Sequence, residues 1–337
     1  MWRVIASRLL SALPNLIGVV IITFVLTRAL PGDPAAFFAG PAGTTEAVEQ
    51  VRKKLGLDQS LLVQFGVYVK QLSQGDLGVS LNTGQPVLTE IIQRLPASME
   101  MTFMGLFLAL IVAIPLGIAA ASKPGSMIDH VCRIITTAGV SLPTFFTGLL
   151  LSYVFYLILG WAPSPIGRLD PYFSPPAHVT GFYLIDSAIA LDPQLFIACF
   201  KQMILPAITM GLFVLAPIAR MTRASMLSVL NADYIRTATS FGLNTRTVLI
   251  TYAFRNALLP VVTTMGMVFS FLLGSNVLVE KVFAWPGIGS FAVESLIASD
   301  YAPVQGFVLT MAIVYVALNL AIDLLYGLID PRVRLEG

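Results

Sequence analysis

The side chains that most often carry out chemistry are few in this sequence and lie far apart. The histidines are His130 and His178, and the cysteines are Cys132 and Cys199. Each histidine falls in a loop or at the edge of a long apolar segment, so we expect no histidine-based metal pair and no Ser–His dyad inside such a segment. The cysteines lack the spacing of metal ligands, which favours ordinary packing. We predict no catalytic residue and no metal site on this chain.

The lysines do not form a nucleotide-binding motif. A P-loop needs a Gly-Lys pair followed by Ser or Thr, because its glycines and its lysine together surround the phosphates. No lysine in this sequence follows a glycine; the lysines are Lys53, Lys54, Lys70, Lys123, Lys201 and Lys281. The sequence therefore predicts no ATP-binding site of this type and no cofactor-binding residue.

Polar side chains inside the long apolar segments are the remaining candidates for a functional role. Such residues can line a path for a polar solute, and prolines nearby can kink helices toward it. They can equally form hydrogen bonds between neighbouring membrane helices, so the pattern leaves both roles open. The candidates for a path are Ser141, Thr144, Thr264, Ser270 and Asn276, with Pro143 and Pro206 as possible kinks.

The composition indicates which elements position these residues. Of the 337 residues, 56% are hydrophobic and only 11% are charged, whereas soluble domains carry roughly 25% charged residues. Because a bilayer leaves no water to satisfy the backbone, the spanning segments are predicted to be helices, and the fold all-α. Six stretches without a charged residue reach the roughly 18 residues that a crossing needs. They are Leu9–Thr27, Met101–Ser122, Ile134–Gly167, Gln202–Ala219, Asn256–Val279 and Tyr301–Ile322, and the third helix is predicted to end near Ile158.

The charge distribution predicts the orientation of these helices. The first stretch follows Arg3 and Arg8, as in a signal peptide, but its length and the lack of a cleavage signal predict a retained helix. With the N-terminus inside, the cytoplasmic segments carry eleven basic and four acidic residues, against nine basic and thirteen acidic outside. Because positive charge concentrates in cytoplasmic loops, both termini are predicted to be cytoplasmic.

The segments outside the membrane are predicted to contain short helices. Residues 31–97 form a long extracytoplasmic segment, in which helices are expected at 45–54, with Thr45 as cap, at 60–73 and at 86–95. Residues 160–201 are rich in proline, which excludes long regular structure. A tight turn is expected at 285–289.

The loop at residues 220–255 is the one substantial cytoplasmic loop. Within it, Tyr234, Ile235, Ala238 and Phe241 recur at helical spacing, and Gly242 follows as a stop. A short amphipathic helix of this kind either lies on the lipid headgroups or inserts into a groove of a cytoplasmic partner. The pattern alone favours neither.

This loop also resembles a known family. Asp233-Tyr234-Ile235-Arg236-Thr237-Ala238 with Gly242, followed by Arg255-Asn256-Ala257-Leu258-Leu259-Pro260, is similar to the conserved cytoplasmic loop of binding-protein-dependent ABC importer permeases. In their peptide/nickel branch the loop commonly opens with Arg-Thr-Ala. Further motifs that look like this branch are Leu30-Pro31-Gly32-Asp33-Pro34, Gly75-Asp76-Leu77-Gly78, Gly181-Phe182 with Leu184-Ile185-Asp186, Pro286-Gly287-Ile288-Gly289 and Asp330-Pro331-Arg332. The resemblance covers almost the whole chain.

The resemblance implies a fold and a division of the chain. The expected fold is the six-transmembrane-helix type I permease fold, with an additional large extracytoplasmic segment after the first helix. The expected parts are 1–30 with the first helix, 31–97 outside, the permease core at 98–331 with the coupling loop at 220–255, and a cytoplasmic tail at 332–337. The residues that the resemblance assigns to coupling with an ATPase are Tyr234, Arg236, Thr237, Ala238, Phe241 and Gly242.

The resemblance also implies partners and a cargo. It predicts a multi-pass protein of a bacterial inner membrane that works with a second, homologous permease, two ATP-binding subunits and an extracytoplasmic solute-binding protein. ATP and Mg²⁺ would be bound by the partners, the lipid bilayer surrounds the chain, and no nucleic acid is involved. The implied cargo is a dipeptide or short oligopeptide; nickel chelates, glutathione and other small conjugates are the alternatives.

A stand-alone secondary transporter is the alternative from another class. Ion-coupled transporters place ionisable groups near the membrane midplane. Here Arg28 and Asp323 fall near the ends of predicted helices, and the predicted membrane cores are otherwise uncharged. The sequence therefore favours a permease driven by an external motor, over this alternative and over an intramembrane enzyme.

Overall fold

The computed structural model describes residues 2–29, 33–39, 43–54 and 56–329. These residues form helices joined by turns and loops, apart from an isolated β-bridge between Val79 and Pro86. The predicted all-α class is confirmed. The motif at residues 30–34 lies partly outside the described residues, and the motif at 330–332 and the tail at 332–337 lie wholly outside them.

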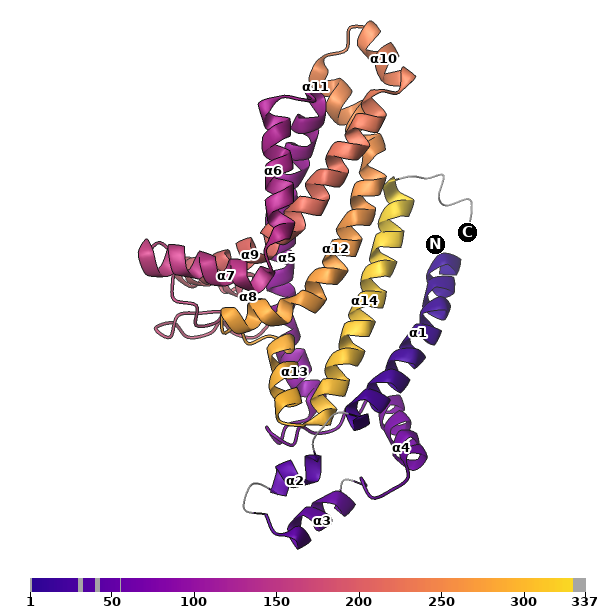
Figure 1. The fold of residues 1–337 in the computed structure, drawn as a ribbon, viewed down its shortest axis with the longest axis vertical. Helices are drawn as coiled ribbons and strands as arrows, with labels where there is room; N and C mark the ends of the chain where they lie inside the picture. The colour runs from indigo at the N-terminus through magenta and orange to yellow at the C-terminus, as the bar shows by residue number, and fades with distance from the viewer. Residues whose placement is uncertain (1, 30–32, 40–42, 55, 330–337) are drawn as a thin grey trace. The chain divides into compact units, whose positions relative to one another are not determined.

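The helices are labelled in Figure 1. The first five are α1 (Trp2–Ala29), α2 (Pro34–Ala39), α3 (Thr45–Lys54), α4 (Leu61–Ser73) and α5 (Val87–Ser122). The central ones are α6 (Met127–Ser141), α7 (Thr144–Leu151), the π-helix η1 (Ser152–Ile158), α8 (Tyr183–Ile189) and α9 (Pro193–Leu230). The last are α10 (Asp233–Ser240), α11 (Thr245–Thr247), the π-helix η2 (Val248–Phe254), α12 (Arg255–Val282), α13 (Ile288–Ile297) and α14 (Tyr301–Ile329).

The membrane-spanning helices occur where the apolar stretches predict them. Among the described residues, five segments are long and apolar enough to cross a membrane, and there are six if the bent pair formed by α6 and α7–η1 is one span. The five are Leu10–Arg28, Val87–Ser122, Pro193–Leu230, Thr245–Gly274 and Tyr301–Gly327. Five of the predicted stretches overlap these spans and the third overlaps the bent pair. Helices such as α5 and α9 extend beyond the apolar stretch, because a helix does not stop where the hydrocarbon ends.

The third predicted span is broken rather than continuous. α6 and α7 meet at an angle of 104°, and α7 runs almost at right angles to α6 (Figure 1). The break falls at Leu142 and Pro143, because proline lacks an N–H and disfavours helical geometry in the residue before it. Leu142 accordingly has the extended angles φ −108° and ψ 137°. The predicted end of this helix near Ile158 agrees with η1.

The chain forms two compact units. One consists of Met1–Ala97 with Pro286–Val316, and the other of Ser98–Trp285 with Ala317–Gly337. We call them the N-terminal unit and the core unit and describe each by itself.

The core unit is organised around α9. This helix packs most extensively against α12 and also contacts α6, α7 and α8. Glycines let α5 approach it closely: a Cβ on Gly117 would lie 2.7 Å from the Cβ of Thr222, and one on Gly105 would lie 2.7 Å from the Cβ of Met210. Small residues at such crossings are the usual means of packing membrane helices, since no hydrophobic effect drives their association within lipid.

The N-terminal unit contains the short helices expected outside the membrane, with two corrections. The N–H of Ala47 donates to Oγ1 of Thr44 at 3.2 Å, so Thr44, and not Thr45, caps α3. The helix expected at 86–95 is not separate, because it continues through Pro96 into α5. Val87 and Ile91 pack against Ile288 in a buried cluster, and this packing holds the helix on its course.

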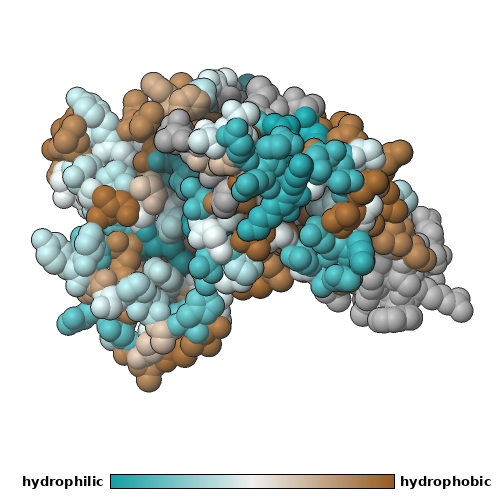
Figure 2. All heavy atoms as spheres, turned by 90° about the horizontal axis from the view of Figure 1, so that it is seen from below, coloured by the Kyte–Doolittle hydropathy of each residue, from teal (hydrophilic) through white to brown (hydrophobic). Residues whose placement is uncertain are grey.

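The turn expected at 285–289 leads into a helix that the sequence analysis did not predict. Gly287 is its N-terminal cap, and α13 begins at Ile288. In contrast, α3 and α4 bury none of their residues. Figure 2 views the molecule from the end at which α3 lies in Figure 1, and hydrophilic side chains gather over much of this surface.

Candidate functional site

Helix α10 is the short amphipathic helix that the sequence predicts in the loop 220–255. Its first turn contains Asp233, whose charge is favourable at a helix N-terminus. Three hydroxyls on α10 donate to backbone carbonyls one turn earlier: Thr237 to Asp233, Thr239 to Ile235 and Ser240 to Arg236, at 2.9–3.0 Å. Gly242 has φ +76°, the left-handed conformation that ends a helix and favours glycine.

Two apolar side chains attach α10 to the core unit. Ile235 is 4% exposed and Ala238 is 6% exposed. Ile235 belongs to a buried cluster formed by residues from α5, α9, η2 and α12, namely Ala121, Met226, Val248, Ala253 and Ala257. α10 therefore lies on the ends of the long helices, as Figure 1 shows.

The other side of α10 is open to a partner. Phe241 is 81% exposed, and Tyr234 is also exposed. Arg236 forms only a long, exposed ion pair with Asp233, with Nη1 3.6 Å from Oδ1. Thr237 and Gly242 are exposed as well. Exposed aromatic rings beside an exposed guanidinium are side-chain types enriched among the residues that dominate binding at protein interfaces.

The six predicted coupling residues thus occupy two different positions. Tyr234, Arg236, Thr237, Phe241 and Gly242 lie on the open side, whereas Ala238 faces the core unit. The sequence pattern placed Tyr234 and Phe241 on one apolar face with Ile235 and Ala238. Only the latter two are buried: Phe241 lies beyond the last residue of α10, and Tyr234, in its first turn, is 44% exposed.

A short connection links α10 to α12. Asn244 caps α11, and its Oδ1 accepts from the N–H of Thr247 at 2.8 Å. η2 then continues directly into α12. α10 is thus joined to α12 both by the short turn at 241–244 and by the packing of Ile235 against η2.

An ion pair that the sequence analysis missed joins α6 to α9 in the same unit. Nε and Nη2 of Arg223 donate to the two carboxylate oxygens of Asp129 at 2.5 and 2.9 Å. The N–H of Gly125 also donates to this carboxylate, at 2.9 Å. This fork-like geometry is among the stronger arrangements of hydrogen bonds. Its members lie 94 positions apart, so no local signal in the sequence reveals the pair.

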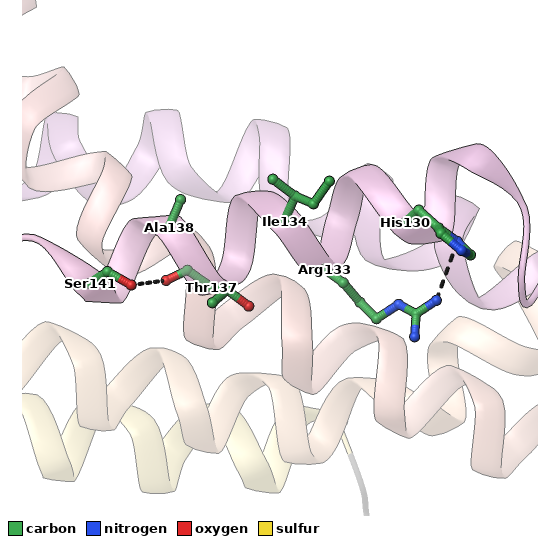
Figure 3. A pocket seen from close by; sticks show the side chains of 6 residues that line it. All are labelled: His130, Arg133, Ile134, Thr137, Ala138 and Ser141. Atoms are coloured by element: carbon green, nitrogen blue, oxygen red, sulfur yellow. Dashed lines mark hydrogen bonds between the residues drawn. The ribbon is translucent and has the colours of Figure 1, made fainter.

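Of the predicted path residues, Ser141 and Thr144 lie on either side of the break between α6 and α7. Ser141 lines a cavity of about 550 Å³ on α6, together with His130, Arg133, Ile134, Thr137 and Ala138. Figure 3 shows that its hydroxyl is bonded to the carbonyl of Thr137, at 2.7 Å. Thr144 is half-buried.

The predicted path residues on α12 make hydrogen bonds within the protein, two of them inside α12 and one to α5. Thr264 is buried and donates to the carbonyl of Pro260, and Ser270 donates to that of Gly266. Asn276 is buried, and its Nδ2 donates to the carbonyl of Ser98 and to Oγ1 of Thr102, both on α5. Hydrogen bonding between helices is thus the role that the structure favours for Asn276.

A buried ion pair holds the loop after η1. Nη2 of Arg168 donates to Oε2 of Glu100 at 2.6 Å, and both side chains are buried. Glu100 also accepts from the N–H of Leu184 at 2.7 Å, and Arg168 donates to the carbonyl of Gly181 at 2.8 Å. The guanidinium carbon lies 3.5 Å from the centre of the Tyr183 ring. The motif at 181–186 is therefore fixed to α5 by charge.

Asp186 accepts hydrogen bonds from the start of this motif and from the two residues before it. Its carboxylate accepts from the hydroxyl and N–H of Thr180 at 2.7 and 2.8 Å, from the N–H of Gly181 at 2.9 Å and from that of Val179 at 3.4 Å. Burial works to raise the pKa of Asp186, but these hydrogen bonds stabilise the charged form more strongly, so its pKa lies below the ordinary value.

No group of three or more His, Cys, Asp or Glu side chains is placed to hold a metal ion in the part of the chain that the structure describes.

Comparison with known proteins places this geometry in a family. Residues 113–335 match the model of the "Binding-protein-dependent transport system inner membrane component". Residues 1–102 match the model of the corresponding N-terminal region.

Individual relatives match along the full length. The probable D,D-dipeptide transport system permease protein DdpB of Escherichia coli (strain K12) is 43% identical over 336 residues, covering 100% of this chain and 98% of the relative. The dipeptide transport system permease protein DppB of Haemophilus influenzae is 42% identical, covering 99% of this chain and 100% of the relative. The DppB protein of Alkalihalophilus pseudofirmus is 39% identical, covering 97% and 98%.

Proposed function

Because this chain belongs to the family of binding-protein-dependent transport system inner membrane components and is a permease subunit of an ABC importer, we propose that α10 couples it to an ATP-binding partner. The observation that carries the proposal is the two-sided arrangement of α10. Ile235 and Ala238 are buried in the core unit, while Tyr234, Arg236 and Phe241 are left for a partner. An exposed helix with aromatic anchors is suited to inserting into a groove.

The motor lies outside this chain in this proposal. A change between inward-facing and outward-facing states requires a ligand that binds one state better than the other. The sequence has no P-loop, so ATP and Mg²⁺ are bound by two ATP-binding subunits. When ATP draws these subunits together, each moves the helix docked on it, and η2 passes the displacement of α10 to α12.

The remaining partners follow from the family's description. A component of a binding-protein-dependent system receives its cargo from a solute-binding protein. We propose that this protein docks on the extracytoplasmic side, that a second homologous permease forms the other half of the pathway, and that both termini are cytoplasmic. The excess of basic residues in the segments assigned to the cytoplasm, α10 included, supports this orientation.

The proposed cargo is a dipeptide or short oligopeptide. Support comes from the relatives, whose names refer to dipeptides and whose similarity extends over the whole chain. Ser141 and Thr144, at the break between α6 and α7, are the residues we propose for the path. A weakly polar path suits a permease whose partner protein selects the cargo.

Photo-crosslinking at Phe241 tests the coupling proposal. A benzoylphenylalanine replacing Phe241 is expected to cross-link to a P-loop ATPase in membranes that contain the assembled transporter. The matched control replaces Tyr172, which is 96% exposed in the loop after η1 and so presents the same probe elsewhere. Cross-linking of the ATPase from Tyr172, or from neither position, would refute the coupling assignment and the orientation together.

Uptake measurements test the cargo separately. Cells that depend on this permease are expected to take up a radiolabelled dipeptide, and unlabelled dipeptides are expected to compete in excess. Glutathione and a nickel chelate serve as competitors of the alternative classes. Competition by one of these and not by dipeptides would reassign the cargo while leaving the coupling proposal intact.

A further inference from the structure

The last turn of the first span carries an arginine, Arg28. In the part of the chain that the structure describes, the guanidinium of Arg28 makes no ion pair. Its polar contacts are long: Nε lies 3.4 Å from Oε1 of Gln64, and Nη1 lies 3.4 Å from Oγ1 of Thr27. A guanidinium has further N–H donors in a planar fork. Arg28 therefore has donors available for an anion.

Aromatic side chains from α1 and α14 lie against this guanidinium. The guanidinium carbon lies 4.4 Å from the centre of the Phe24 ring and 5.8 Å from that of Tyr301. Phe24 is buried and contacts Phe65 edge-on, with centroids 5.2 Å apart, and stacks on Tyr68 at 5.8 Å. Cation–π contact with a fixed ring orients the charge without neutralising it.

Arg28 lines two cavities in the N-terminal unit, one apolar and one with a mixed polar and apolar lining. One, of about 440 Å³, is otherwise apolar and is lined by Ile21, Phe24, Val25, Leu61, Leu62 and Phe65. The other, of about 380 Å³, has a mixed lining, whose polar side chains are those of Lys54, Gln59, Gln64, Tyr68, Gln71, Asp76, Asp300, Tyr301 and Gln305. Arg28 lines both. A ligand that fills the two must be apolar at one end, anionic in the middle and polar at the other end.

We propose that Arg28 binds the phosphate of a membrane glycerophospholipid, with an acyl chain in the apolar cavity between α1 and α4 and the polar head in the second cavity. The guanidinium fork matches phosphate oxygens well. Arg28 ends the first span, which is where lipid phosphates lie. Leu62 is 84% exposed, and an acyl chain beside it removes this surface from water.

The bound lipid fills the space between α1 and α4 and so stabilises the packing of the two helices. Because α4 buries none of its residues in the protein, its apolar side needs an apolar neighbour, and a lipid chain shared with α1 supplies one. A free phosphate or a short peptide satisfies Arg28 but leaves the apolar cavity empty. The proposal depends on α1 spanning the membrane and not on the cargo.

Photo-labelling of the assembled transporter in nanodiscs tests the site. The probe is phosphatidylglycerol with a diazirine in one acyl chain, and labelled peptides are identified by mass spectrometry. Labels are expected at residues 61–65 of α4. Diacylglycerol with the same chain lacks the phosphate, and it is expected to label these residues about tenfold less, as the loss of charge-assisted hydrogen bonds implies.

Substitutions and a soluble competitor test whether the charge of Arg28 is needed for lipid binding. R28Q is expected to reduce labelling by phosphatidylglycerol to the diacylglycerol level. R94Q is the matched control, because Arg94 is paired with Glu90 at 2.7 Å and lines neither cavity. Excess glycerol 3-phosphate should leave labelling unchanged; displacement by it would assign the site to a soluble phosphate and overturn the lipid proposal.

Equal labelling by both probes would show ordinary bilayer contact and refute the site. The same conclusion follows if R28Q and R94Q label alike. If R28Q does not accumulate in the membrane, the comparison of the two probes on the unaltered chain decides by itself.

Discussion

The motif at 181–186 and helix α10 lie next to opposite ends of α9, and they are attached to the core unit in opposite ways. Glu100 and Arg168 hold the motif through a buried ion pair, a carbonyl, an N–H and an aromatic ring. α10 is held by the apolar contacts of Ile235 and Ala238. One attachment is directional and charged, and the other is neither.

This difference indicates which region is free to move. A buried ion pair stabilises one geometry, since separating its charges in a low-dielectric interior leaves both unsatisfied. Apolar contact is nondirectional and depends on the area buried, so a helix can tilt on such a surface at little cost. The rigid attachment suits a surface that must keep its shape, and the apolar one suits a helix displaced by a motor.

Breaking the ion pair is expected to have the largest effect. Removing one partner leaves the other buried and unpaired, so E100Q and R168M should each lower the free energy of unfolding by about 3–5 kcal/mol. Thermal unfolding of the purified transporter measures this. The double variant should be more stable than either single one, because neither charge is then left alone. R236M is the control with an exposed pair, and a loss of stability equal to that of R168M would contradict the comparison.

Truncation of Ile235, the buried side chain that attaches α10 to the core unit, is expected to have the next largest effect. Truncating a buried isoleucine to alanine typically costs about 2 kcal/mol or more. I235A should therefore loosen α10 and raise hydrogen exchange at 233–242 while leaving the rest of the unit protected. Y234A removes an exposed ring from the same helix. It should leave hydrogen exchange unchanged but lower the amount of ATP-binding subunit that co-purifies with the permease. If exchange rises across the whole core unit in I235A, α10 is not a separate element.

Substitution of Gly242, which follows α10 in a left-handed conformation, is expected to have a smaller effect. Gly242 has φ +76°, and a Cβ there meets nothing within 4 Å, so strain and not collision sets the cost. A β-branched residue is disfavoured there by about 1–2 kcal/mol, whereas asparagine tolerates this conformation. G242V should leave the chain in the membrane but uncouple ATP hydrolysis from uptake, and G242N should retain coupling. Normal uptake by G242V would remove the support for the coupling assignment.

Acid is expected to loosen the motif at 181–186 before α10. The pKa of Asp186 lies below its ordinary value, so its contribution to stability is complete above about pH 4 and is lost as the pH falls through its pKa in the folded state. D186N should cost about 1 kcal/mol at neutral pH. The gap between the unfolding temperatures of D186N and the unaltered chain should narrow as the solution is acidified below pH 4. A gap that stays constant would contradict the ionised state of Asp186.

The sequence by itself determined the features that depend on neighbours along the chain. Apolar stretches long enough for a bilayer predict helices, because the backbone must satisfy its own hydrogen bonds in lipid. The presence of α10 and of a stop at Gly242, two residues after its end, follow from helical spacing and from the conformational freedom of glycine. The family motifs could also be recognised in the sequence, because each is a contiguous stretch of residues.

Tertiary structure alone decided the features that depend on residues far apart. Glu100 and Arg168 are 68 positions apart, and nothing near either predicts their contact. The course of α5 through Pro96 depends on packing against Ile288, which outweighs the local cost of proline. The apolar pattern of α10 included four side chains, and only contact with α5, α9 and η2 selected Ile235 and Ala238 for burial. Local pattern restricts the backbone, but burial depends on which distant surfaces meet, and only the folded chain settles that.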